Sequence, residues 1–275
     1  MHGVSRDSGN GHGHVSWHVA DLLDPVQVER LMVAVRPTHL LHLAWYTEHQ
    51  GYWSALENLH WLEASLQLVR AFAASGGGRV VIAGSCAEYH TEGGVCVESA
   101  TPLVPITLYG ASKHALQVAV SSFAATAGLS AAWARVFHLY GPREQPRRLV
   151  PSVVRHLLRQ EQVPCSEGSQ LRDYLYVDDA AAALVSLLES SVEGAVNVAS
   201  GVPIAVRDFV QRIACQIGRS DLLRLGALAR CIGDPDVLVA NVDRLTCEVG
   251  WRPSVGIDVG LARTIEWWAA IAHSL

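Results

Sequence analysis

Residues 76–84 have the sequence GGGRVVIAG, in which three glycines separate a helix-forming segment from a continuous apolar run. The preceding residues 53–75 have the amphipathic pattern of a long helix, and the glycines are expected to end it. Residues 79–84 are apolar without alternation, which is typical of a strand buried on both faces. Such strands belong to parallel sheets covered by helices, so this stretch predicts an α/β fold with a doubly wound parallel sheet.

The same alternation of strands and helices continues on both sides of this stretch. We expect residues 1–142 to form the region around the main sheet, and residues 143–275 a smaller subdomain that returns some elements to that sheet. Asp24 precedes Pro25 and is the expected N-cap of a helix. The other predicted elements are strands at 15–19, 39–44 and 131–136, helices at 25–36, 107–126, 149–160, 178–190, 206–218 and 258–272, and a loop at 85–106.

Composition excludes several classes of protein. The 275 residues are 50% hydrophobic and carry a net charge of −5 without a basic run, which argues against a nucleic-acid partner. No apolar run reaches the ~18 residues of a membrane span. Six cysteines lie far apart without a C-x-x-C pair, which favours reduced thiols and a cytoplasmic protein. His12, His14 and His18 are interpreted as part of a solvated loop rather than a metal site.

Lys113 is the single lysine in a chain that contains 20 arginines. A lysine that persists in such an arginine-rich chain is a candidate for chemistry that arginine cannot perform. It follows Tyr109 by four residues on a predicted helix, which places both side chains on one face. An ammonium group beside a phenol favours the phenolate, so we expect a lowered pKa for Tyr109 and a role in proton transfer. The alternative is a chance surface pair.

Five motifs follow one another along the chain: AGSCAEY at 83–89, Y-x-x-x-K at 109–113, RVFHLYGP at 135–142, RDYLYVDD at 172–179, and GWRP at 250–253 followed by GL at 260–261 and TIEWW at 264–268. Ser85, in the first motif, stands twenty-four residues before Tyr109, and the motif RDYLYVDD is rather specific. In these motifs and their order, over nearly the whole chain, the sequence resembles the extended short-chain dehydrogenase/reductase family of nucleotide-sugar epimerases, dehydratases and reductases, with its Rossmann-like sheet.

The resemblance implies roles for individual residues. Ser85 would bind the reacting sugar oxygen while Tyr109 moves its proton, and Asn58 would support Lys113. Arg172 would pair with the diphosphate of a nucleotide sugar, and its alternative is a salt bridge to Asp173 or Asp178. Cys86 is a further implied substrate contact. His138 stands where relatives usually have asparagine beside the substrate, so it is either a donor to the sugar or its phosphate or a structural histidine.

Cofactor contacts also follow from the resemblance. Arg6 stands where users of NADP often have a positive charge, so the sequence leans towards NADP over NAD. The other implied contacts, besides Tyr109 and Lys113, are Asp21, Leu22, Leu43, Ala44, Trp45 and Phe137. The resemblance further implies a homodimer formed through the helices at 53–75 and 107–126.

Two departures from the family qualify these roles. The glycine-rich turn G-x-x-G-x-x-G is absent, Gly9, Gly11 and Gly13 have the wrong spacing, and Met1 to Arg6 resembles the end of the family's second strand. We therefore expect an N-terminally shortened form that lacks the first, central strand of the sheet. Cys86 and Ala87 occupy the places of the dehydratases' Asp-Glu pair, while Glu88 is expected to point the other way, so dehydration is disfavoured.

The sequence therefore predicts a nucleotide-sugar 4-keto reductase or C4 epimerase that uses Tyr109, Lys113 and Ser85, without deciding between the two reactions. Residues 1–142 would bind the cofactor and carry the catalytic residues, and residues 143–275 would bind the substrate. The alternative is a non-catalytic or weakly active nucleotide-sugar-binding relative that has lost the turn for the cofactor phosphates.

Overall fold

The apolar run at residues 79–84 forms strand β4 (Arg79–Ser85), which is buried along nearly its whole length in the computed structural model. β4 lies inside a four-stranded sheet with the order β10–β6–β4–β3. Its neighbour β3 (His39–His42) pairs with it in parallel, with His42 opposite Ile82. The other two strands are β6 (Ser130–Val136) and β10 (Gly194–Val198). The predicted α/β fold with parallel strands is thus present.

A second parallel pair precedes this sheet. β1 (His2–Ser5) pairs with β2 (Ser16–Val19) as a separate two-stranded sheet. Helix α1 (Pro25–Val35) follows, and the Asp24 side chain caps it by accepting hydrogen bonds from the backbone N–H groups of Val26 and Gln27. Within the described residues, β1 and β3 each have a strand neighbour on one edge only. Gly9, Gly11, Gly13 and His12 lie outside the described residues.

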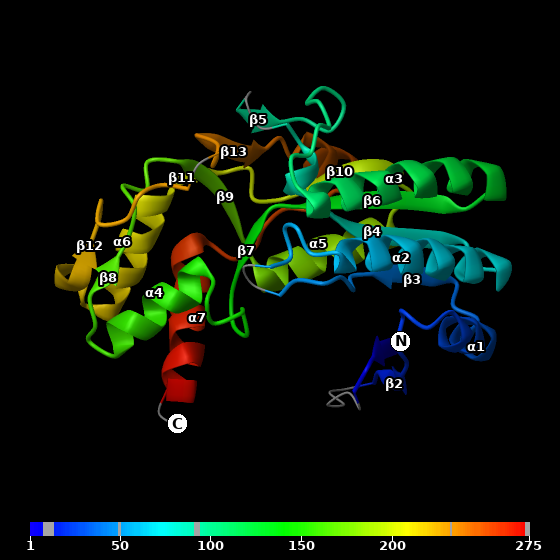
Figure 1. Ribbon diagram of the computed structural model, residues 1–275, viewed down its shortest axis with the longest axis horizontal. Helices are drawn as coiled ribbons and strands as arrows, with labels where there is room; N and C mark the ends of the chain where they lie inside the picture. Colours follow the sequence, from blue (N-terminus) through cyan, green and yellow to red (C-terminus); the bar gives the residue numbers. More distant parts are fainter. Residues whose placement is uncertain (8–13, 49–50, 91–93, 232, 273–275) are drawn as a thin grey trace. The chain divides into compact units, whose positions relative to one another are not determined.

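Helices α2 (Glu57–Ala74) and α3 (Leu108–Ala127) lie side by side (Figure 1). α2 begins four residues later than the sequence predicts, because Asn58 Nδ2 donates to the backbone carbonyls of Tyr52 and Ala55 and holds that stretch in a turn. α3 begins at its N-cap Thr107, whose Oγ1 accepts from the N–H of Gly110, and ends at Gly128 in the left-handed conformation.

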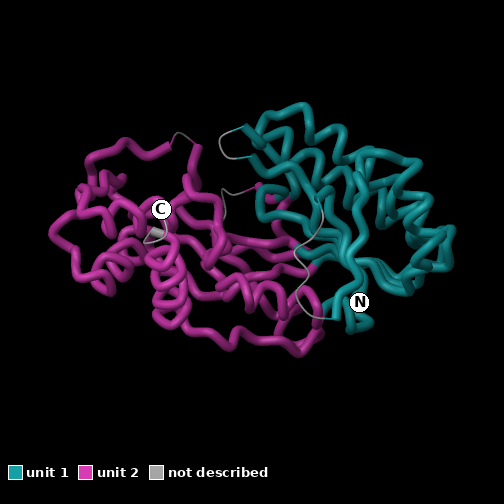
Figure 2. The backbone as a smooth tube through the Cα atoms, turned by 90° about the horizontal axis from the view of Figure 1, so that it is seen from below, with its two compact units in different colours: residues 1–88, 103–134, 187–195 teal, residues 89–102, 135–186, 196–275 magenta. Residues whose placement is uncertain are grey.

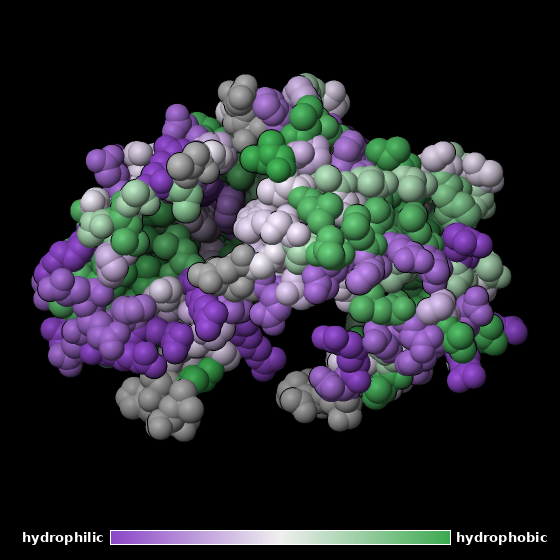
Figure 3. Space-filling model, viewed as in Figure 1, coloured by the Kyte–Doolittle hydropathy of each residue, from purple (hydrophilic) through white to green (hydrophobic). Residues whose placement is uncertain are grey.

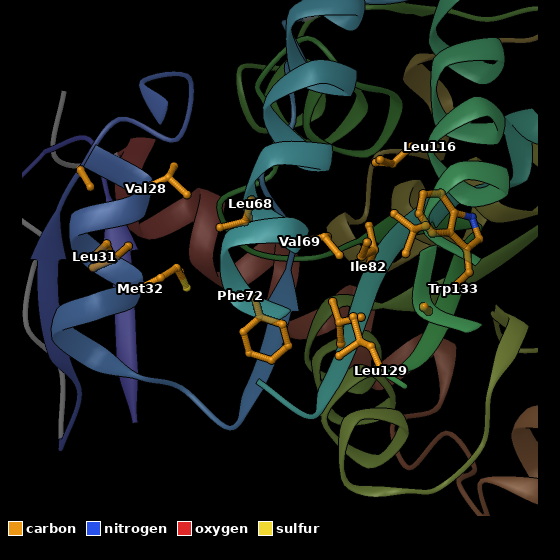
Figure 4. Packing of buried hydrophobic residues seen from close by; sticks show 14 residues of the cluster. Val28, Leu31, Met32, Leu68, Val69, Phe72, Ile82, Leu116, Leu129 and Trp133 are labelled. Atoms are coloured by element: carbon orange, nitrogen blue, oxygen red, sulfur yellow. The ribbon is translucent and has the colours of Figure 1, made fainter. Parts of the chain in front are cut away.

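The hydrophobic core beneath these helices joins α1, α2, α3, β4 and β6. In Figure 4, Val69 of α2 points toward Ile82 of β4 and Leu68 points toward α1, while Phe72 and Trp133 belong to the same cluster. Each of these side chains is almost completely removed from solvent, so together they account for much of the stability of this part of the chain. Val28, Leu31, Met32, Leu116 and Leu129 complete the labelled cluster.

The structure describes residues 1–7, 14–48, 51–90, 94–231 and 233–272, and Figure 2 shows the two compact units they form. Unit 1 comprises residues 1–88, 103–134 and 187–195; unit 2 comprises residues 89–102, 135–186 and 196–275. Each unit is built from several separate segments of the chain. The predicted boundary after residue 142 separates a cofactor-binding role from a substrate-binding role, and that assignment stays a prediction.

Unit 2 contains a mixed sheet with the order β11–β9–β13–β5, with β7 paired to β9 in parallel. Helices α4, α6 and α7 pack on one another around Phe209 and Leu261. No described helix is long and apolar enough to cross a membrane. The remaining bounds are β5 (Val95–Cys96), β7 (His138–Tyr140), α4 (Leu149–Leu158), β8 (Val163–Pro164), β9 (Leu171–Tyr176), α5 (Val177–Glu189), β11 (Pro203–Ala205), α6 (Val206–Ile217), β12 (Leu223–Arg224), β13 (Val237–Ala240) and α7 (Ile257–Ala272).

Candidate functional site

Ser85, Tyr109 and Lys113 come together in unit 1. Ser85 is the last residue of β4, and its side chain is hydrogen-bonded to the hydroxyl of Tyr109 on α3. α3 can approach this strand end because Gly110 has no side chain: an added Cβ would lie 2.3 Å from the carbonyl oxygen of Ala87. The sequence-predicted serine and tyrosine therefore form one hydrogen-bonded pair.

Lys113 lies one helical turn after Tyr109 and is only 3% exposed. Its Nζ donates to the carbonyl oxygen of Ala83 at 2.8 Å and lies 3.7 Å from the centroid of the Trp45 ring. Burial lowers the pKa of Lys113 to about 7, against the opposing effect of the nearby Glu88 carboxylate. The single lysine of the chain is thus a buried amine that titrates near neutrality.

Tyr109 is enclosed by aromatic rings. The rings of Tyr52, Trp53 and Trp45 meet it edge-on at centroid distances of 5.0, 5.7 and 6.5 Å. Burial raises the pKa of Tyr109, although the hydrogen bond with Ser85 opposes that rise. The expectation of a lowered pKa is therefore wrong for this structure, because Lys113 is directed to a carbonyl and to Trp45. Tyr109 is a neutral phenol here.

Asn58 is hydrogen-bonded to Trp45. Its Oδ1 accepts from Trp45 Nε1 at 2.8 Å, and its Nδ2 is used by two backbone carbonyls. Asn58 is thus linked to Lys113 through Trp45, which lies over the ammonium group, and its role in supporting the lysine stays a prediction. Asn58 is completely buried, so these hydrogen bonds fix the position of the indole.

Glu88 also belongs to this strand end, although the sequence predicted no role for it there. It ends the short 3-10 turn Cys86–Glu88 and is completely buried. Its Oε1 accepts from the N–H of Ser85 at 2.7 Å and from Trp133 Nε1 at 2.9 Å. An acidic residue three places after a predicted catalytic serine, within an apolar stretch, was the available signal. Cys86, in the same turn, is partly exposed and forms no disulfide with a described cysteine.

The predicted cofactor contacts of unit 1 lie at the carboxyl ends of strands, where α/β proteins bind ligands. Arg6 is exposed directly after β1, and Asp21 follows β2 with its Oδ1 accepting from the N–H of Leu23. Leu43 follows β3 and is 54% exposed. Leu22 packs against the core, and Ala44 is half-buried. Phe137 belongs to unit 2, where it is buried and its N–H donates to Val198.

Arg172 and His138 lie on neighbouring strands of unit 2, β9 and β7. Arg172 is 4% exposed and forms an ion pair with Asp234. The sequence offered a salt bridge from Arg172 to Asp173 or Asp178 as the alternative, and this is wrong because the partner is Asp234. Asp173 is instead completely buried and accepts hydrogen bonds from the backbone N–H groups of Ser200, Gly201 and Ala240, and from the Ser200 hydroxyl.

Two buried polar atoms of unit 2 have no hydrogen-bond partner among the described residues: His138 Nδ1 and Glu144 Oε2. Burial lowers the pKa of His138 to about 4, and the charges of Arg172 and Arg148 add to the effect. Burial raises the pKa of Glu144 to about 7. Glu144 also lines a cavity of about 490 Å³ with Leu139–Arg143, Val177 and Asp178. The unpartnered carboxylate oxygen of Glu144 at this cavity is suited to a ligand.

No group of three or more His, Cys, Asp or Glu side chains in the described part of the chain could hold a metal ion. His12 lies outside that part.

The chain belongs to the NAD dependent epimerase/dehydratase family, whose model matches residues 1–199. This confirms the family that the five motifs indicate. Its α/β Rossmann-like epimerase fold is shared with the structure of MoeE5 in complex with UDP-glucuronic acid and NAD, at a TM-score of 0.83 and 28% identity, covering 100% of this chain and 91% of that one.

Curated relatives with different reactions are about equally similar. The chain is 28% identical over 207 residues to the UDP-glucose 4-epimerase of Corynebacterium glutamicum, covering 69% of this chain and 62% of the relative. It is 27% identical over 179 residues to the dTDP-glucose 4,6-dehydratase of Escherichia coli, covering 62% and 49%. The chain thus matches about half to three-fifths of the length of these relatives.

Proposed function

We propose that this protein carries out NAD(P)-dependent 4-keto reduction or C4 epimerisation of a nucleotide sugar. The observation that carries the proposal is the hydrogen bond between Tyr109 and Ser85 with Lys113 one turn away. This arrangement gives a sugar oxygen one hydroxyl to hold it and another to exchange its proton. The bound nicotinamide would supply or accept the hydride.

The protonation state of Tyr109 favours the reductive direction. Burial raises the pKa of this phenol, so it carries a proton at neutral pH. A neutral phenol can donate to the oxygen of a sugar ketone as that oxygen gains negative charge. Ser85 Oγ would orient the same oxygen, and protonated Lys113 would stabilise the phenolate left behind.

Dehydration is disfavoured by the position of Glu88. Its carboxylate is buried against the N–H of Ser85 and the indole of Trp133, where it serves the protein's own groups. Cys86 and Ala87, which occupy the intervening turn, carry no carboxyl group. The pair of carboxyl groups that would act as acid and base in the removal of water is therefore not present in this turn.

The cofactor would lie along the carboxyl ends of β1, β2 and β3. Arg6 is exposed and suits a phosphate, and the partly exposed Asp21 suits an adenosine. The exposed apolar surface of Leu43 suits an apolar ring face. Arg6 supports NADP over NAD, although the family name and the NAD-bound relative refer to NAD. Trp45 covers the ammonium of Lys113, so a ribose hydroxyl can reach Lys113 only after that ring moves.

A nucleotide sugar would bind unit 2 through Arg172 and His138. Arg172 would release the carboxylate of Asp234 and bind a diphosphate in its place. A planar guanidinium group forms paired hydrogen bonds with a phosphate as well as with a carboxylate. The unpartnered Nδ1 of His138 supports a further polar contact with the substrate.

We also propose that the sheet is completed by one more parallel strand between β1 and β3. Both strands are paired on one edge only within the described residues, and an open edge offers a row of unpaired backbone groups. Extending the reading frame upstream tests this: a strand followed by G-x-x-G-x-x-G within ~40 residues is expected, and its absence would reject the shortened-chain hypothesis.

A cytoplasmic homodimer through α2 and α3 is the proposed assembly. Figure 3 shows apolar side chains gathered over these helices. Leu56 and Leu59 at the start of α2 and Val118 on α3 are each about half or more exposed. Light scattering across a concentration range tests this, since a monomer at all concentrations would rule the dimer out.

The second candidate function is binding of a nucleotide sugar without turnover. The position of the Trp45 ring against the ammonium group of Lys113 favours it, because the ring restricts access to that group. Fluorescence titration with NADH and NADPH separates the two. Binding of either cofactor, followed by consumption of NADPH or inversion at C4 with one of a panel of nucleotide sugars, is expected for the enzyme. Failure of both cofactors to bind at millimolar concentration would overturn the proposal.

A further inference from the structure

A completely buried carboxylate lies directly behind the proposed catalytic residues. Both oxygens of Glu88 accept from Trp133 Nε1, at 2.9 and 3.0 Å, and Oε1 also accepts from the N–H of Ser85 at 2.7 Å. The strand leaves little space here, since a Cβ on Gly84 would lie 2.6 Å from the same Oε1. Glu88 therefore holds the main chain of Ser85 in place.

Lys113 also forms a hydrogen bond with the main chain at the end of β4. Its Nζ donates to the carbonyl of Ala83, two residues before the N–H that Glu88 accepts. A buried ammonium group is strongly disfavoured unless an opposite charge lies near it. Glu88 is the group whose charge raises the pKa of Lys113 and opposes the effect of burial.

Among the residues that the structure describes, the other titratable groups around Lys113 do not provide this negative charge. His42 on β3 is buried and neutral, because burial and the charge of Lys113 lower its pKa to about 3. Tyr109 on α3 is a neutral phenol, and Cys86 in the 3-10 turn is partly exposed. Arg79, at the opposite end of β4, bonds to Ser130, Leu187 and Val192. The ionisable side chains of α2, which packs on α3, are all exposed: Glu57, His60, Glu63 and Arg70.

We propose that Glu88 is a positioning residue of this site, whose buried carboxylate both fixes the main chain of Ser85 and balances the ammonium charge of Lys113. It acts through these two residues and does not touch the reacting atoms. The role rests on the proposed function of Ser85 and Lys113, while the charge balance itself can be measured without substrate or cofactor.

The single lysine makes the measurement unambiguous. Protein grown with [13Cε]lysine gives one lysine resonance, and its chemical shift against pH reports the titration of Lys113 alone. Glu88→Gln removes the charge while the remaining Oε1 can still accept from Ser85 and Trp133. Trp133→Phe is the matched control, because it removes the indole donor and keeps the charge.

The wild-type midpoint is expected near pH 7. Glu88→Gln should lower it by about one pH unit, as expected for loss of a nearby opposite charge, and Trp133→Phe should leave it near the wild-type value. An unchanged midpoint in Glu88→Gln, or an equal fall in both variants, would overturn the proposal.

If Glu88→Gln does not fold, the double variant Glu88→Met with Trp133→Phe removes the charge and its indole partner together. The titration midpoint of Lys113 in this double variant should also fall by about one pH unit, and a midpoint equal to that of the wild type would contradict the proposal. A pH profile of turnover adds a separate test, since loss of the charge should move the alkaline limb to lower pH. Absence of turnover in the wild type would reject the proposed function and leave the titration result standing.

Discussion

The Nζ of Lys113 lies 3.7 Å from the centroid of the Trp45 ring, and the indole N–H of Trp45 is bonded to the buried Asn58. The ammonium group therefore has an aromatic face on one side and the Ala83 carbonyl on another. A cation against an indole face is stabilised by about 1–2 kcal/mol when desolvated. Trp45 thus protects the charge and restricts access to it.

Trp45→Ala should accordingly make Lys113 more reactive towards an amine-modifying reagent. Loss of the ring both opens the site and removes a contact that favours the protonated amine, so labelling at pH 7 should accelerate about tenfold. Peptide mass spectrometry separates this lysine from the N-terminal amine. Trp61→Ala is the control, because Trp61 contacts Trp45 at 6.3 Å without covering Lys113. Equal rates in wild type and Trp45→Ala would contradict the protective role.

Patterns along the chain predicted the elements well because strands and helices depend on local periodicity. The apolar run at 79–84 and the glycines before it were sufficient to place β4 and the end of α2. The four-residue spacing also placed Tyr109 and Lys113 on one helix face.

Partners from distant segments could not be predicted in this way. Arg172 pairs with Asp234, 62 residues later, and Asn58 bonds to a tryptophan on a different element. The aromatic rings that bury Tyr109 come from the segment between β3 and α2, so the direction of its pKa shift depends on tertiary packing. Spacing alone carries no information about such burial.

Tyr109→Phe should abolish turnover while leaving cofactor affinity nearly unchanged. The substitution removes only the hydroxyl that is bonded to Ser85, and the ring keeps its edge contacts with Tyr52 and Trp53. Loss of a proton donor in the transition state costs about 100-fold or more in rate. Cofactor fluorescence titration and a nucleotide-sugar assay measure the two properties, and retained activity would refute the catalytic role.

Gly84→Ala should destabilise the fold by about 3 kcal/mol, since overpacked cores lose stability on this scale. Its Cβ would lie 2.1 Å from Trp133 Nε1 and 2.6 Å from Glu88 Oε1, distances that real side chains do not tolerate. Urea unfolding measures the loss. Gly78→Ala is the control, because its Cβ would meet nothing closer than the Thr38 carbonyl at 3.9 Å. Similar stabilities for the two variants would show that the strand end can relax.

Asp234→Asn should strengthen the binding of diphosphate-containing nucleotides. The carboxylate of Asp234 neutralises the buried guanidinium of Arg172. An asparagine at this position carries no charge, so the guanidinium group becomes available to a phosphate. A gain of several-fold in affinity for UDP or dTDP is expected, on the order of 1 kcal/mol. Asp236→Asn is the control, because Asp236 forms its ion pair with Arg230 instead. Calorimetry showing weaker binding in Asp234→Asn would place the diphosphate elsewhere.

His42 should make the protein less stable in mild acid. Burial lowers its pKa in the folded state to about 3, while an unfolded histidine titrates near 6.5. Between these values the unfolded chain binds a proton that the folded chain does not, so the free energy of unfolding falls as pH drops below about 6.5. His138, with a pKa of about 4, acts in the same direction, and Glu144 acts in the opposite one between its ordinary value of 4.5 and about 7.

His42→Gln isolates the contribution of His42. The variant should flatten the dependence of stability on pH between pH 6 and 4 by up to about 1.4 kcal/mol per pH unit, the limit for one proton. Loss of the hydrogen bond to Ser65 changes stability at every pH and leaves this slope unaffected. His60→Gln, at an exposed position on α2, serves as the control in the same urea titrations. If both variants keep the wild-type slope, the acid sensitivity originates from other groups.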